Sequence, residues 1–312
     1  MGAGHSHSHD HGHHHGHGHL HAPADFGNAF AIGIALNVIF VVVEATYGFL
    51  SGSMALVADA GHNLSDVLSL LLAWGASVLA KRKPSERFTY GLKSSTILAA
   101  MANAATLMIA LGIILVETIR RFADPQPVEG GTVMLVAGIG IVINTATALL
   151  FLRGRKDDLN IRGAFMHMAA DALVSLGVVI SGAMILLTGA LWIDPVTSLI
   201  IVALIAWGTW GLAKDSLKMG LLGVPDNCDE GAVRTYLTSL PGVDRVHDLH
   251  IWPMSTTETA FTAHLVMPGG HPGDVFLHEV AHELEHSHNI GHATIQIERD
   301  CEDCVLEDEA KV

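Results

Sequence analysis

The 312-residue chain is short of charge, because only 15% of its residues are charged whereas 50% are hydrophobic. A soluble domain carries about 25% charged residues, so this chain is too apolar to be a single soluble domain. Cysteine is also scarce: the chain has three, too few for a disulfide framework. Residues 1–23 lack the apolar centre of a secretory signal peptide, and we expect no cleavage there. The shortage of charge beside so many hydrophobic residues indicates a membrane protein.

Basic residues are few as well, with 17 Lys and Arg against 31 Asp and Glu. The imbalance is local, since residues 224–312 contain 17 acidic and 4 basic residues, a net charge of -13. Nucleic-acid binding needs clustered basic residues. We therefore expect no nucleic-acid partner. The part of the chain that we assign to the membrane is nearly neutral.

Six apolar segments have the length to cross a bilayer, which takes about 20 residues as a helix. We expect these spans at residues 26–50, 54–80, 94–118, 132–152, 164–191 and 195–213. The predicted domains are a disordered His-rich tail at 1–25, a six-helix transmembrane domain at 26–220, a cytosolic metal-binding domain at 221–300 and an acidic tail at 301–312.

Positive residues between the spans orient the chain, because cytoplasmic loops carry an excess of Lys and Arg. Residues 81–93 contain five of them and residues 153–162 contain four, whereas residues 51–53 contain none. We predict that both termini are cytoplasmic and that the membrane is the plasma (inner) membrane.

Histidine is abundant near both ends of the chain and rare between them. Of 21 histidines, ten lie in residues 5–21 and nine in residues 247–292, so that only His62 and His167 lie between. A purification tag would explain the first group. Its irregular mixture of His with Gly, Ser and Asp instead favours a native metal-collecting tail.

The two isolated histidines each precede an aspartate by four residues: His62 with Asp66 in the second span, and His167 with Asp171 in the fifth. Helix positions four apart share a face, so each pair can point at one cation. Two nitrogens and two oxygens suit tetrahedral zinc. Such pairs can instead join helices by hydrogen bonds. Each ionisable group in a membrane costs about 2.5–3.5 kcal/mol, which favours a functional site.

Asp59 lies three residues before His62, close to the same helix face. It can hydrogen-bond to the metal ligands without binding the metal itself, act as a proton relay, or face water near the end of the span. The remaining polar residues of the spans are expected to hold helices together or line a water-filled cavity; they include Glu44, Asn63, Asn103, Glu117 and Asn144.

The C-terminal part has the pattern of a small α/β domain. We expect a helix at residues 229–239 capped by Asp229, strands at 243–252 and 259–267, a helix at 272–288 and a strand at 293–299. This αββαβ order suits a two-layer, ferredoxin-like sandwich with both helices on one face of the sheet. Cys301 and Cys304 have metal-ligand spacing and are candidate C-terminal ligands, although one such pair is half of a zinc site.

The second predicted helix of this domain contains a metalloprotease pattern. His278, Glu279 and His282 fit H-E-x-x-H, and His288 has the spacing of a third ligand. The longer motif requires Gly where this chain has Glu285. The domain also offers no second lobe for a substrate cleft. We therefore interpret the pattern as a solvated or metal-collecting helix face and keep proteolysis as the weakest alternative.

Several motifs, taken in order, resemble the zinc-transporting branch of the cation diffusion facilitator family. They are Ala58-Asp59-Ala60 with His62 and Asp66, Phe88-Thr89-Tyr90-Gly91, His167 with Asp171, Asp194-Pro195, His247-Asp248-Leu249-His250-Ile251-Trp252, and Thr294-Ile295-Gln296-Ile297-Glu298. The similarity covers residues 26–300. It implies a homodimer in which each protomer has six transmembrane helices and a metallochaperone-like cytosolic domain.

The resemblance also implies site residues. The transport site, where a divalent metal is exchanged for protons, would consist of His62, Asp66, His167 and Asp171. The implied cytosolic ligands are His247, His264, Glu298, His278 and His292. Gln296 replaces a His of some relatives, which leaves the number of cytosolic ions open. Residues 81–93 contain no His or Asp, and we predict that the loop site of other relatives is absent.

The sequence thus predicts an antiporter, not an enzyme, that exports Zn²⁺ from the cytoplasm in exchange for H⁺. Zinc would also be a structural or regulatory ion of the cytosolic domain. Cadmium, cobalt and nickel stay open as substrates, because affinity order alone does not choose among these metals. A membrane-anchored zinc sensor or buffer is the main alternative. It would explain the His-rich ends but would leave the paired residues inside the membrane without a role.

Overall fold

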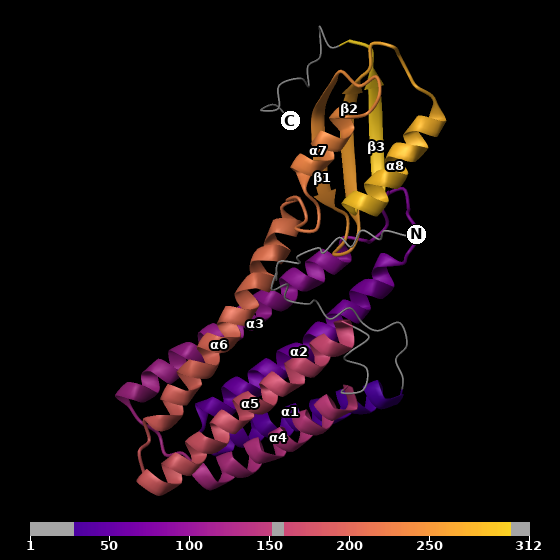
Figure 1. Cartoon of the computed structure of the whole chain (residues 1–312). Helices are drawn as coiled ribbons and strands as arrows, with labels where there is room; N and C mark the ends of the chain where they lie inside the picture. The colour runs from indigo at the N-terminus through magenta and orange to yellow at the C-terminus, as the bar shows by residue number, and fades with distance from the viewer. Residues whose placement is uncertain (1–27, 152–158, 301–312) are drawn as a thin grey trace, which may run out of the picture.

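The computed structural model describes residues 28–151 and 159–300. A bundle of six helices leads into a smaller C-terminal domain (Figure 1). The helices of this six-helix bundle are α1 (Asn28–Leu50), α2 (Met54–Ala80), α3 (Ser95–Ala123), α4 (Gly130–Phe151), α5 (Leu159–Thr188) and α6 (Ile193–Gly220). The predicted fold class, six membrane helices followed by a small α/β domain, is confirmed.

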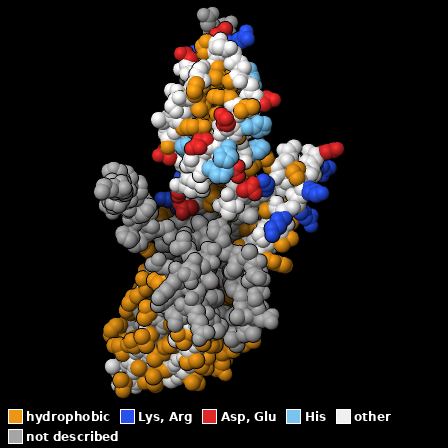
Figure 2. Space-filling view, turned by 45° about the vertical axis from the view of Figure 1, so that its right-hand side comes forward, with side chains coloured by type: hydrophobic (Ala, Val, Ile, Leu, Met, Phe, Trp, Pro, Cys, Tyr) orange, Lys and Arg blue, Asp and Glu red, His pale blue; other side chains and the backbone are white. Residues whose placement is uncertain are grey.

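The surface of the bundle is apolar. In the part of the chain whose side chains are described, α2 to α6 each include a segment long and apolar enough to cross a membrane, and residues 37–50 of α1 form a shorter apolar helix. Figure 2 shows apolar side chains over the lower part of the molecule, whereas charged and His side chains gather above it. Large apolar side chains such as Trp207 (83%) and Leu187 (86%) are exposed. Exposed apolar surface on this scale is expected of helices that face lipid.

Within the bundle, α4 packs against α5 and α3 packs against α6, while α2 contacts α1, α3, α5 and α6. Two glycines set the close approach of α4 and α5. A Cβ on Gly130 would lie 2.6 Å from the carbonyl oxygen of Gly182, and a Cβ on Gly182 would lie 2.9 Å from that of Gly130. Small residues at such contacts allow helix backbones to approach closely.

The first turn of α2 is held by two acceptors. Ser53 is the N-cap, and its Oγ accepts a hydrogen bond from the backbone N–H of Leu56 at 3.2 Å. Asp194, in the first turn of α6, accepts from the N–H groups of Met54 at 2.8 Å and Ala55 at 3.4 Å. These N–H groups have no partner within the helix, and a carboxylate also interacts favourably with the helix dipole. The contact therefore fixes the start of α2 against α6.

The C-terminal domain consists of α7 (Glu230–Thr238), β1 (Arg245–Pro253), β2 (Thr259–Val266), α8 (Asp274–His288) and β3 (His292–Glu298). In the sheet order β1-β2-β3, β2 is antiparallel to β1 and parallel to β3. Leu237 of α7, Leu284 of α8 and Phe261 of β2 belong to one hydrophobic core, so both helices cover the same face of the sheet. As predicted, Asp229 caps α7 by accepting from the N–H of Ala232 at 3.2 Å.

The connection between α2 and α3, together with the first turn of α3, contacts the C-terminal domain at the hairpin of β1 and β2 and at the start of β3. The contacts are an ion pair between Lys93 and Glu258, hydrogen bonds from Ser94 Oγ to the Met254 carbonyl (3.2 Å) and from the Thr256 N–H to Thr96 Oγ1 (3.1 Å), and an edge-on ring contact between Tyr90 and His292 with centroids 5.6 Å apart. The bundle and the C-terminal domain therefore meet at this connection as well as along the chain after α6.

Candidate metal centres

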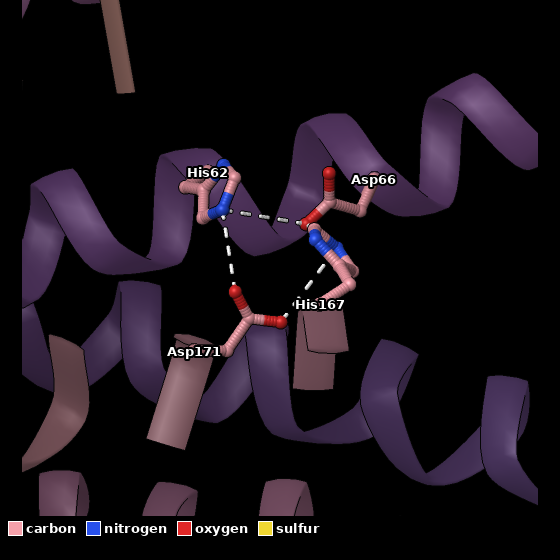
Figure 3. Close-up of side chains that lie close together, drawn as sticks. All are labelled: His62, Asp66, His167 and Asp171. Atoms are coloured by element: carbon pink, nitrogen blue, oxygen red, sulfur yellow. Dashed lines mark ion pairs between the residues drawn. The ribbon is translucent and has the colours of Figure 1, made fainter. Parts of the chain in front are cut away.

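Two helices of the bundle bring together the four residues predicted for transport. His62 and Asp66 lie one turn apart on α2, and His167 and Asp171 lie one turn apart on α5. The four side chains converge on one region between the helices (Figure 3). One nitrogen or oxygen atom from each lies within 4.8 Å of the other three. We call this group the bundle cluster.

The spacing of these atoms suits a tetrahedral ion. His62 Nε2 lies 3.4 Å from Asp171 Oδ1 and 3.8 Å from Asp66 Oδ2. His167 Nε2 lies 3.1 Å from Asp66 Oδ2 and 3.6 Å from Asp171 Oδ2. Zinc binds nitrogen and oxygen ligands at about 2.0–2.2 Å, which places two ligands of a tetrahedral zinc ion about 3.4 Å apart. Only small side-chain movements would therefore let all four residues bind one ion.

The charge and hydrogen bonding of the bundle cluster point to a divalent cation. Asp66 Oδ2, His167 Nε2 and Asp171 Oδ2 are buried and form ion pairs among themselves but no hydrogen bonds. Buried polar atoms without hydrogen bonds are destabilising, and a bound cation would satisfy all three. Two ionised carboxylates balance the charge of a divalent ion. The Asp171 side chain is 3% exposed, whereas those of His62, Asp66 and His167 are 19–28% exposed, so an ion can approach from one side.

Asp59 lies outside the bundle cluster. It is fully buried, it accepts a hydrogen bond from Ser175 Oγ at 3.0 Å, and its carboxyl group lies close to that of Glu44. Asn63 Nδ2 donates to Glu44 at 3.0 Å and so links α2 to α1, in line with the expectation that these two residues hold helices together. Whether Asp59 supports the metal ligands stays a prediction.

A second cluster lies on the sheet of the C-terminal domain. It contains His247 of β1, His264 of β2 and Glu298 of β3, with one ligand atom from each within 4.8 Å of the others. His247 and His264 are paired across the two strands, and their ring centroids are 5.0 Å apart. His247 Nε2 lies 3.0 Å from Glu298 Oε2, and His264 Nδ1 lies 2.9 Å from Glu298 Oε1. Two imidazoles and a carboxylate are a common zinc ligand set. We call this group the sheet cluster.

Hydrogen bonding keeps the carboxylate of the sheet cluster charged. Burial disfavours the ionised form of Glu298, but the hydrogen bonds from Gln296 and His247 and the nearby His264 outweigh this effect and hold the pKa of Glu298 below its ordinary value. At neutral pH this carboxylate is therefore ionised, which is the form that binds a cation.

Asp248 is a residue of this region that the sequence analysis did not identify as functional. It has a φ of 50° and lies where the pairing of β1 with β2 is irregular, between His247 and His250. Its Oδ2 is 3.4 Å from His264 Nε2, and its Oδ1 is 2.9 Å from His250 Nε2. A carboxylate behind a ligating imidazole fixes the ring orientation and tautomer. The sequence feature that could have identified Asp248 is its position beside His247 in the His247-Asp248-Leu249-His250 motif.

Two residues predicted for the cytosolic site lie elsewhere in the C-terminal domain. His278 is exposed on α8, and His292 is exposed at the start of β3, where it faces Tyr90. Neither belongs to the sheet cluster. Cys301 and Cys304, like the His-rich tail at residues 1–25, lie outside the described residues.

The metalloprotease pattern on α8 forms no group of three metal-ligand side chains among the described residues. His278, Glu279 and His282 are all exposed. The His282 ring stacks on His286 with centroids 4.0 Å apart, and the ring of His288 lies beside Tyr236. This arrangement fits the interpretation of α8 as a solvated face.

Comparisons with known proteins cover both parts of the chain. The family model described as "Cation efflux transmembrane domain" matches residues 30–219, and the model described as "Cation efflux protein, cytoplasmic domain" matches residues 225–300. "Zinc transporter ZitB" of Escherichia coli is 37% identical over 271 residues, which is 86% of this chain and 86% of that protein.

Two other relatives extend the comparison. "Cadmium, cobalt and zinc/H(+)-K(+) antiporter" of Bacillus subtilis is 36% identical over 264 residues, 83% of this chain and 85% of that protein. "Metal cation efflux system protein CzcD" of Cupriavidus metallidurans is 33% identical over 299 residues, 96% of this chain and 90% of that protein. The family and these relatives are transporters and not enzymes, which rules against the metalloprotease alternative.

Proposed function

Because this chain belongs to the cation efflux family, the cation diffusion facilitators that its motifs resemble, we propose that it exports Zn²⁺ from the cytoplasm in exchange for H⁺. The observation that carries the proposal is the bundle cluster, in which two imidazoles and two carboxylates lie at the spacing of tetrahedral zinc ligands inside an apolar bundle. The names of the relatives support the substrate and the antiport.

Proton coupling follows from ligand chemistry. Zinc ligands bind in their deprotonated form, so protons and metal compete for the same atoms. An unperturbed His titrates at about pH 6.5, within the physiological range. With the site open to the neutral cytoplasm, the bundle cluster loads Zn²⁺. When the site opens to the other side, protons arriving at His62 and His167 displace the ion, and each metal leaves as at least one proton enters.

We propose that the protein lies in the plasma membrane and that both of its termini are in the cytoplasm. It is supported by the connection between α2 and α3, where Lys81, Arg82, Lys83 and Arg87 are all exposed, because cytoplasmic loops are rich in Lys and Arg. This connection also contacts the C-terminal domain, as a loop on the same side of the membrane must.

We also propose that the protein is a homodimer and that the sheet cluster binds a structural or regulatory zinc ion. The match of residues 225–300 to the cytoplasmic dimerisation domain of cation efflux proteins supports the dimer. The ligand set of the sheet cluster, with its ionised carboxylate, supports the zinc ion.

Zinc flux tests the proposed function. Proteoliposomes containing a zinc dye and a pH dye would be given zinc and a pH gradient, with wild type beside Asp171→Ala. We expect wild-type zinc flux opposed to proton flux, and a loss of both of at least about tenfold in Asp171→Ala, because a metal ligand is removed. Asp226→Ala is the matched control, since Asp226 is 70% exposed and contacts Lys218 outside the cluster. Zinc binding without any zinc flux in wild type would favour the sensor or buffer instead.

A further inference from the structure

Glu44 and Asp59 form a buried pair of acidic residues that the proposed metal binding does not use. Both residues are 0% exposed. Glu44 on α1 accepts a hydrogen bond from Asn63 through Oε2, and Asp59 on α2 accepts one from Ser175 through Oδ2. Their other oxygens, Glu44 Oε1 and Asp59 Oδ1, have no N–H or O–H donor in the described part of the structure.

The two carboxyl groups also lie close enough to interact with each other. Ionised carboxylates are acceptors only, so a hydrogen bond between two of them requires a proton on one. Two ionised carboxylates buried side by side would also repel each other strongly. A single proton shared by the pair removes this repulsion and supplies the missing donor.

The surroundings of the pair contain little positive charge. The ionisable groups that face it are His62 of α2 and Asp171 of α5, both from the bundle cluster. α4, which packs against α1, contains no titratable residue. α3 and α6 carry their ionisable residues in the first or last two turns, at Glu117, Arg120, Arg121, Asp194, Lys214, Asp215 and Lys218. The pair is therefore sensitive mainly to the charge of the bundle cluster.

The pair lies one helix turn from the bundle cluster, on the side away from the C-terminal domain. Asp59 precedes His62 on α2 by three residues, toward the helix end capped by Ser53. Ser175 follows Asp171 on α5 by four residues and runs the same way, because neighbouring spans are antiparallel. Asn63, which donates to Glu44, directly follows His62. One short stretch of α2 therefore contributes to the bundle cluster and also contacts the acidic pair.

We propose that Glu44 and Asp59 form a proton-binding site that is coupled to metal binding. The pair holds one proton on the Glu44 carboxyl group, donated in a hydrogen bond to the Asp59 carboxylate. When Zn²⁺ enters the bundle cluster one turn away, its two positive charges stabilise the fully ionised pair. The O–H bond of Glu44 then breaks, and the proton leaves to water. This inference rests on the proposed function and adds one proton to those exchanged for each metal ion.

Calorimetric zinc titration of the full chain in detergent, repeated in buffers of different ionisation enthalpy, counts the protons released per Zn²⁺ bound. Glu44→Gln keeps the size of the side chain and can still donate to Asp59 and accept from Asn63, but it has no proton to release. We expect the count to fall by about one in Glu44→Gln and in Asp59→Asn. Ser175→Ala is the matched control: it removes a hydrogen bond to Asp59, keeps both carboxyl groups, and should keep the wild-type count.

An unchanged count in both carboxyl variants would overturn the proposal, because a merely structural pair would alter stability but not proton release. Infrared difference spectra of the wild type cover the case in which the variants fail to fold. Zinc should remove the band of a buried protonated carboxyl group, and a spectrum without this loss would also overturn it. A wild type that releases the pair's proton on zinc binding, yet moves no zinc across vesicles, would instead refute the proposed transport.

Discussion

At the scale of single residues, the nitrogen ligands of His62 and His167 determine which metals the bundle cluster prefers. Imidazole nitrogen suits Zn²⁺ and other late transition metals, whereas sites made only of carboxylate oxygen suit Mg²⁺, Ca²⁺ and Mn²⁺. The bundle cluster combines two such nitrogens with two carboxylates, a ligand set that suits zinc better than the hard cations. Replacing one imidazole by a carboxylate should therefore weaken the preference for zinc.

The substitution His62→Asp tests this account of selectivity. We expect the ratio of zinc to manganese transport to fall by at least about tenfold, because a nitrogen ligand is exchanged for a harder oxygen ligand. The ratio would be measured by competition between the two ions in proteoliposomes. His282→Asp, at an exposed position on α8, provides the control for a His-to-Asp change outside the cluster. An unaltered metal preference in His62→Asp would show that the ligand type does not set selectivity.

The residues of the bundle cluster could be predicted because each pair lies on one helix, where four-residue spacing fixes a common face. No comparable spacing rule predicts which residues of two different helices contact each other. The pairing of Glu44 with Asp59 depends on the rotation and depth of α1 against α2, and neither quantity can be read from the local sequence pattern. The position of Asp248 behind His264 likewise depends on an irregularity in strand pairing.

At the scale of the elements, hydropathy predicts the apolar part of each helix better than its ends. α2 spans Met54–Ala80, as predicted, because Ser53 caps its first turn and the apolar run ends with the helix. α3 continues to Ala123 and α6 to Gly220, beyond the predicted ends at 118 and 213. The added turns are polar, since Arg120, Arg121 and Lys218 lie in them. Hydropathy marks the bilayer core, whereas backbone hydrogen bonds continue past it.

The contact between Asp194 and the start of α2 should stabilise the bundle. Asp194→Ala removes an acceptor for the N–H groups of Met54 and Ala55, and losing a side-chain acceptor at a helix N-terminus costs about 0.5–2 kcal/mol. We expect a lower midpoint of thermal unfolding in detergent and weaker zinc binding, because α2 carries half of the bundle cluster. Asp124→Ala changes an exposed acidic residue on the same side of the bundle, whose side chain accepts a hydrogen bond from Gln126, and it should behave like wild type. Equal stability of the two variants would mean that the contact of Asp194 does not fix α2.

At the scale of the whole molecule, the bundle cluster and the sheet cluster lie in separate domains that touch at the connection between α2 and α3. A sheet-cluster zinc ion would link β1, β2 and β3, since each strand supplies one ligand. The hairpin of β1 and β2 also contacts Ser94 at the end of this connection and Thr96 in the first turn of α3. Zinc bound at the sheet would therefore stiffen the surface that the C-terminal domain presents to the bundle. An ion that binds only the folded domain stabilises it by about 2.7 kcal/mol at 100 times its dissociation constant.

Hydrogen exchange on the full chain separates the two clusters. We expect zinc to slow exchange of the β1, β2 and β3 amides by up to about 100-fold in the wild type, the effect of that much added stability. Asp171→Ala should show the same protection because its change is confined to the bundle, whereas His264→Ala should lose it. His250→Ala is the matched control, since His250 contacts Asp248 but supplies no atom to the sheet cluster. Zinc protection of the sheet that survives in His264→Ala would show that the ion binds elsewhere in the C-terminal domain.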